Sequence, residues 1–137
     1  MAKLGHLSFD VTDIIKIREF FDCLLGELGF ERRFTMEDAV CYSNPQLDIW
    51  FARDQNPRTS RGNPNPDLEV VAEHTAILVS DASKVRDVER AMTAKGFKPL
   101  FPAQENPQFT EGYFSACFVG PDNIVFEVYA NPKEQAQ

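Results

Sequence analysis

The sequence has 137 residues and a formal net charge of −7, with 43% hydrophobic and 26% charged residues, a composition typical of one globular domain. It contains no basic patch of the kind that neutralises nucleic-acid phosphates, and no apolar stretch long enough to span a bilayer. Its three cysteines form no Cys-x-x-Cys pair and no regular framework. These features predict a cytoplasmic protein that binds neither nucleic acid nor a membrane.

The chain repeats itself. The segment His6–Asp13 (HLSFDVTD) aligns without a gap with His74–Asp81 (HTAILVSD), at an offset of 68 residues (74 − 6). Further along, the Gly-Phe pair at 29–30 matches the pair at 96–97, at an offset of 67 residues (96 − 29). A repeat of this kind predicts two copies of one supersecondary unit.

The first copy predicts a strand, then a helix, then two or three more strands. Its first strand begins at His6, in a run of apolar and β-branched residues. Thr12–Asp13 supply side-chain oxygens for a helix N-cap, and Gly29 suits the helix C-terminus, where a positive φ is favoured. The helix carries apolar residues at helical spacing, namely Ile17, Phe20, Phe21, Leu24 and Leu28. Apolar runs at Ala39–Tyr42 and Leu47–Ala52 predict the later strands.

The second copy predicts the same elements in the same order. Its first strand begins at His74, and Ser80–Asp81 supply the N-cap oxygens of the next helix. The apolar residues of this helix are Val85, Val88 and Met92. Runs at Tyr113–Val119 and Ile124–Ala130 predict the later strands. Extra residues around Pro102–Gly112, rich in Pro and Gln, predict a loop that is longer than its counterpart in the first copy.

These elements predict an α+β fold of two tandem βαβββ modules. We place module one at about residues 4–54, an irregular connector at 55–69, and module two at about 70–132, all within a single domain that spans 1–137. If the two modules pack with pseudo-twofold symmetry, their mixed sheets are expected to form a curved, partly open barrel around a shared cavity.

Two histidines and two acids fall at matched places in the repeat. His6 and His74 are the only histidines, and each begins a copy. Asp48 and Glu127 each lie between apolar residues near the end of a copy, so the acids are expected to meet at the same cavity. Two His with one or two carboxylates suit Zn, Ni, Mn, Co or Fe(II) and leave open positions for substrate. If the first of these strands is shifted by two residues, Trp50 replaces Asp48 and three ligands remain.

The sequence resembles the vicinal oxygen chelate superfamily, which includes glyoxalase I, extradiol dioxygenases, fosfomycin-resistance transferases and bleomycin-binding proteins. The resemblance is carried by His6–Asp13, His74–Asp81 and Gly120–Val128. The last segment is similar to the family's Asp-Pro-Asp-Gly turn and the strand that holds its Glu ligand, here Glu127. Asn123 stands at the glycine position and tolerates the same positive φ. The resemblance implies a divalent metal held by His6, His74 and Glu127.

The resemblance also implies a function. We expect a glyoxalase-like, metal-dependent lyase or isomerase that binds a small substrate through adjacent oxygens and stabilises an enediolate or similar oxyanion. Glu127 or Asp48 would transfer the proton, and Trp50, Tyr113 and Tyr129 would line the substrate site.

Two alternatives stay open. A three-ligand set resembles that of an Fe(II) extradiol-type dioxygenase, although such enzymes use additional histidines that this chain lacks. The other alternative is a metal-free antibiotic-binding protein, like the bleomycin-resistance members. Proteins of this family and size are often homodimers, so a homodimer is expected here.

Overall fold

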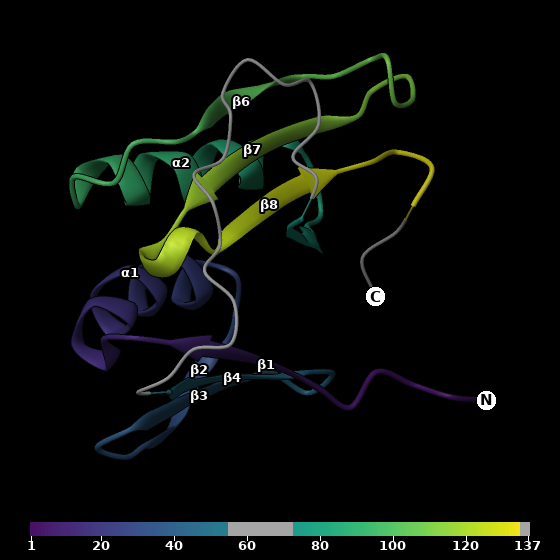
Figure 1. The fold of residues 1–137 in the computed structure, drawn as a ribbon. Helices are drawn as coiled ribbons and strands as arrows, with labels where there is room; N and C mark the ends of the chain where they lie inside the picture. The colour runs from purple at the N-terminus through teal and green to yellow at the C-terminus, as the bar shows by residue number, and fades with distance from the viewer. Residues whose placement is uncertain (55–72, 135–137) are drawn as a thin grey trace. The chain divides into compact units, whose positions relative to one another are not determined.

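The computed structural model describes residues 1–54 and 73–134 and divides into two compact units, Met1–Arg61 and Gly62–Gln137. Each unit holds one copy of the repeat, with one helix and one four-stranded sheet (Figure 1). This arrangement confirms the two tandem βαβββ modules. The predicted connector at 55–69 lies outside the described residues. The barrel and its metal cavity would involve both units together and stay a prediction.

The first unit contains a mixed sheet in the order β1-β4-β3-β2. Strands β1 and β4 are parallel, and the other two pairings are antiparallel. The elements are β1 (His6–Val11), α1 (Ile14–Glu27), β2 (Glu31–Thr35), β3 (Ala39–Ser43) and β4 (Asp48–Arg53).

The second unit repeats this topology in the order β5-β8-β7-β6, again with one parallel pair, β5 and β8. Its elements are β5 (Thr75–Leu78), α2 (Ala82–Ala94), β6 (Phe101–Glu105), β7 (Phe114–Val119), a short 3-10 turn (Pro121–Asn123) and β8 (Val125–Ala130). The residues predicted to form a long loop at Pro102–Gly112 therefore begin as strand, and the loop itself spans 106–113. No helix in the described part of the chain is long and apolar enough to cross a membrane.

Both helices begin and end where the sequence predicts. The Asp13 carboxylate accepts hydrogen bonds from two backbone N–H groups of the first turn of α1, at 3.0 and 3.1 Å. Asp81 accepts one such bond at the start of α2, at 3.0 Å. Just beyond the helices, Gly29 and Gly96 have φ values of 84° and 88°. In the turn before β8, Asn123 has a φ of 57°, as expected for a residue replacing glycine.

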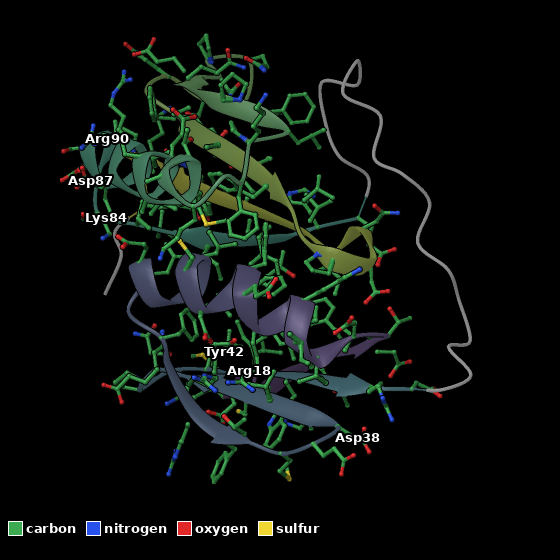
Figure 2. The ribbon with its side chains drawn as sticks, turned by 90° about the vertical axis from the view of Figure 1, so that its left-hand side faces the viewer. Arg18, Asp38, Tyr42, Lys84, Asp87 and Arg90 are labelled. Carbon is green, nitrogen blue, oxygen red and sulfur yellow. The ribbon has the colours of Figure 1, made fainter. Side chains whose placement is uncertain are left out.

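In each unit the helix covers one face of its own sheet. In the first unit Phe51 is fully buried and its ring centroid lies 4.4 Å from that of Phe21 on α1, 5.4 Å from Phe9 and 6.0 Å from Tyr42. In the second unit the helix buries Val85, Val88 and Met92. Charged residues lie on the outer side of this helix, among them Lys84, Asp87 and Arg90 (Figure 2).

Tyr42 joins the first sheet to its helix through a part-buried polar contact. Its hydroxyl donates a 2.7 Å hydrogen bond to Oδ1 of Asp22 on α1. Figure 2 labels Tyr42 and, on the same helix as Asp22, Arg18. Burial and the Asp22 carboxylate raise the pKa of Tyr42 well above its usual value, so the phenol stays protonated and donates.

Replacing Tyr42 with Phe removes this hydrogen bond and leaves the ring in place. We expect the free energy of unfolding to fall by about 1–2 kcal/mol, the range for a hydrogen bond to a charged partner that keeps some solvent contact. Urea denaturation followed by circular dichroism measures the change. A variant as stable as the wild type would show that the bond contributes nothing to the fold.

Candidate metal and substrate site

The face of the second sheet that points away from α2 carries Glu127. In the strand register Glu127 lies opposite Ala76 of β5 and Cys117 of β7. Residues directly opposite each other in a sheet point to the same face, and side chains alternate along each strand. His74, two residues before Ala76, therefore belongs to the same row of side chains as Glu127.

The same register in the first sheet identifies the residue that corresponds to Glu127. Trp50 lies opposite Ser8 of β1 and Cys41 of β3. Ser8 lies two residues after His6, just as Ala76 lies two residues after His74. Trp50, opposite Ser8, therefore occupies the position that Glu127 has opposite Ala76. The alignment of Asp48 with Glu127 was wrong by two residues. The alternative shift, which leaves Trp50 at this position, is the one that the strand pairing supports.

Asp48 has a different place in the first sheet. It lies opposite His6 on one side and Ser43 on the other. The Ser43 hydroxyl donates a 2.5 Å hydrogen bond to its Oδ1, and the Cys41 sulfur lies 3.6 Å from the same hydroxyl. The carboxylate thus has a polar partner, as a partly buried charge requires. The sequence analysis did not identify Ser43, because the contact depends on strand pairing.

In the second unit the His74 and Glu127 side chains meet. The distance between His74 Nε2 and Glu127 Oε1 is 3.0 Å, and the two side chains are only 23% and 10% exposed. The other carboxylate oxygen, Oε2, accepts a 2.7 Å hydrogen bond from the Tyr113 hydroxyl. Both oxygens of Glu127 are therefore held by neighbours within its own unit.

The His74–Glu127 pair fits two adjacent ligands of one metal ion. Ligands at about 2.0–2.2 Å from a divalent ion, at about 90° to each other, have donor atoms about 3 Å apart. The donor set, one imidazole and one carboxylate, suits Zn, Ni, Mn, Co or Fe(II). The hydrogen bond from the Tyr113 hydroxyl to Glu127 Oε2 resembles the supporting hydrogen bonds that usually orient metal-binding carboxylates.

The third predicted ligand, His6, begins β1 in the first unit. Across residues 1–54 and 73–134, no group of three or more His, Cys, Asp or Glu side chains is arranged to hold a metal ion. The structure therefore brings together two of the three predicted ligands, and the role of His6 stays a prediction.

Aromatic side chains adjoin the Glu127 carboxylate. The rings of Tyr113 and Tyr129 are stacked, with centroids 5.1 Å apart and planes 16° apart. Phe109 packs edge-on against Tyr113 at 5.3 Å. Burial, followed by the hydrogen bond to Glu127 and the charge of Glu127, raises the pKa of Tyr113. Two of the three predicted lining residues thus lie beside the predicted ligand, and the sequence analysis missed Phe109.

Trp50, the third predicted lining residue, stacks on Phe34 in the first unit, with centroids 5.8 Å apart and planes 8° apart. Phe34 is 47% exposed, and the Arg33 guanidinium lies 5.4 Å from the centroid of its ring. The sequence analysis did not identify Phe34 as part of a site. Its position opposite Cys41 places it in the same row as Trp50.

Cys117, opposite Glu127, is a buried thiol. Burial raises its pKa to about 12, and the Glu127 carboxylate contributes to the rise. At neutral pH the side chain is therefore a neutral thiol, a form that makes a poor nucleophile.

Solved structures of glyoxalase-related and fosfomycin resistance proteins share this fold of two repeated modules. The chain is similar to a glyoxalase-related enzyme from Fulvimarina pelagi, with 18% identity, a TM-score of 0.73, and coverage of 96% of this chain and 90% of that one. It is also similar to the fosfomycin resistance protein FosX from Listeria monocytogenes, with 17% identity, a TM-score of 0.71, and coverage of 96% and 94%.

A lactoylglutathione lyase from Agrobacterium tumefaciens is similar as well, at 14% identity and a TM-score of 0.64, with 96% of this chain and 95% of that chain covered. No protein-family model matches the sequence, and no curated protein matches it. At these identities the likeness establishes the fold, which confirms the fold expected from the resemblance.

Proposed function

We propose that the protein is a glyoxalase-like lyase or isomerase that uses a divalent metal ion held by His6, His74 and Glu127. The observation that carries this proposal is the 3.0 Å separation of His74 Nε2 and Glu127 Oε1 in the second unit. The names of proteins with the same fold, a glyoxalase-related enzyme and a lactoylglutathione lyase, support the reaction class.

The ion, when bound, would supply a Lewis acid for a substrate that offers two neighbouring oxygens. Glu127 is the residue that we assign to proton transfer, because its carboxylate is held between His74 and a tyrosine hydroxyl and stands beside a half-buried pair of stacked tyrosines. Asp48 is the second candidate for this role, with the Ser43 hydroxyl on its Oδ1. Tyr129 and Trp50 would exclude water from the substrate.

A second candidate function is an Fe(II) extradiol-type dioxygenase. It is favoured by one observation: Trp50 stands at the strand position of Glu127, which leaves a set of two histidines and one carboxylate. It is disfavoured by the histidine count, because both histidines of the chain belong to the proposed ligand set and none remains to move a proton.

Metal analysis and two assays separate these functions. The protein, purified without added metal, is titrated with Zn, Ni, Mn, Co and Fe(II), and elemental analysis gives its native content. Each form is then assayed with the hemithioacetal of a 2-oxoaldehyde and, under oxygen, with a catechol. Isomerase or lyase turnover supports the proposal, and ring cleavage with iron alone supports the dioxygenase. A protein that binds none of these ions would reject both and favour the metal-free antibiotic-binding alternative.

The Asp48→Asn variant tests whether Asp48 ligates the metal directly. Asp48 lies two residues from the position equivalent to Glu127 and accepts a hydrogen bond from Ser43. We therefore expect metal affinity to fall by about tenfold at most, the lower end of the range for residues that support a ligand without binding the metal. Equilibrium titration with Co²⁺ measures the change, and Ser43→Ala serves as the matched control for loss of the same hydrogen bond. A loss as large as that of His74→Ala would make Asp48 a fourth ligand.

A further inference from the structure

Tyr113 lies in the part of the second module that the first module lacks. Tyr113 is the last residue of the loop between β6 and β7, which spans residues 106–113, whereas the turn between β2 and β3 spans only residues 36–38. In the module with the long loop, the β8 residue opposite Ala76 is Glu127. In the module with the short turn, the β4 residue at the equivalent position, opposite Ser8, is Trp50. The extra residues and Glu127 therefore occur together.

The loop holds the backbone of Tyr113 firmly. Its carbonyl accepts a 2.8 Å hydrogen bond from the Asn106 N–H, and its own N–H donates to the Thr110 carbonyl at 3.1 Å. The preceding Gly112 has a φ of 80°, and a Cβ there would lie 2.7 Å from Cγ of Pro132. Only glycine avoids both the strain and the clash, so the chain enters Tyr113 along one path.

The ring of Tyr113 is packed as firmly as its backbone. Tyr129 stacks on the ring at 5.1 Å and Phe109 meets it edge-on at 5.3 Å. With the ring held in this way, its hydroxyl reaches Oε2 of Glu127 at 2.7 Å. The opposite oxygen, Oε1, then faces His74 Nε2 at 3.0 Å. A fixed donor on one oxygen limits rotation of the whole carboxylate group.

We propose that Tyr113 is a positioning residue for Glu127, and that the extra loop of the second module serves to place its hydroxyl on Oε2 so that Oε1 faces His74. This assigns Tyr113 to the support of a metal ligand instead of to substrate contact. The inference rests on the proposed function, because it takes Glu127 to be a ligand.

The test compares two Tyr→Phe variants. Tyr113→Phe should weaken Co²⁺ binding by about tenfold, the lower part of the usual range for loss of a supporting hydrogen bond. It should also change the visible absorption spectrum of the Co²⁺ form, because that spectrum reports the coordination of the carboxylate. Tyr42→Phe is the matched control: it removes a tyrosine–carboxylate hydrogen bond of the same 2.7 Å length, outside the proposed ligand set. The control should leave affinity and spectrum unchanged.

A second variant guards against a folding defect. Phe109→Ala keeps the Tyr113 hydroxyl and removes the ring that packs against it edge-on, at a residue that is 46% exposed. We expect a smaller loss of affinity than in Tyr113→Phe, with the same direction of spectral change. Thermal unfolding of the metal-free proteins confirms that each variant is folded.

The outcomes distinguish this inference from the proposed function. If the wild type binds Co²⁺ and both Tyr113→Phe and Phe109→Ala match it in affinity and spectrum, the positioning role is overturned and the metal site stands. If the control changes the spectrum as much as Tyr113→Phe does, the effect is structural and the inference is again overturned. If the wild type binds no metal, the proposed function fails, and the inference fails with it.

Discussion

His74→Ala should weaken binding of a divalent metal by more than about 100-fold, beyond the range for residues that only support a ligand. The substitution removes one of the two donor atoms that lie 3.0 Å apart in the second unit and leaves the carboxylate of Glu127 to hold the ion without it. A competition titration of Co²⁺ or Zn²⁺ against a chromophoric chelator measures the loss. Elemental analysis of the purified variant gives an independent value.

The control for His74→Ala is Glu73→Ala, which changes the exposed neighbouring residue and should leave metal affinity unchanged. His6→Ala examines the ligand that the other unit would supply. Equal losses from His6→Ala and His74→Ala would support one shared site. Full retention of binding in His74→Ala would contradict the metal centre, whatever the other variants do.

The local elements of this fold could be predicted from the sequence because their signals are local. The offset of 68 residues placed Asp13 and Asp81 at matched helix starts, and both carboxylates cap their helices. Gly29 and Gly96 marked the helix ends, where a positive φ is needed. Each of these residues acts within a few positions of itself, so a sequence pattern is enough to identify it.

The register of β4 could not be predicted in the same way. Asp48 was aligned with Glu127 because each acid lies between apolar residues near the end of a copy, yet side chains alternate with a period of two along a strand. A shift of two residues therefore keeps every side chain on its face and leaves the pattern acceptable. Only the pairing of Trp50 with Ser8 and Cys41 decides the alignment.

Contacts between neighbouring strands were not predicted from the sequence either, because they too depend on how the strands pair. Tyr113 was expected to line the substrate site, and that role stays a prediction. The sequence did not predict the contact of its hydroxyl with Glu127, which lies 14 positions further along the chain. That contact depends on the length of the loop, on the β7–β8 register and on the rings around Tyr113. Ser43 on Asp48 is a similar case, with a partner five positions away across a tight turn. The sequence could therefore name residue types for a candidate site, whose role stays a prediction, and it could not predict the hydrogen bonds of Glu127 and Asp48.

Phe51→Ala should lower the free energy of unfolding by about 3–5 kcal/mol, the usual cost of removing a fully buried aromatic ring. Phe51 is 0% exposed and contacts three other rings, so truncation opens a cavity that its neighbours cannot fill. Urea denaturation followed by circular dichroism measures the change. Phe34→Ala is the matched control, because Phe34 is 47% exposed and has one ring partner, Trp50, and we expect it to cost about 1 kcal/mol. Equal losses from the two variants would contradict a core centred on Phe51, and with it the division of the first sheet into a helix-covered face and a face that carries Asp48 and Trp50.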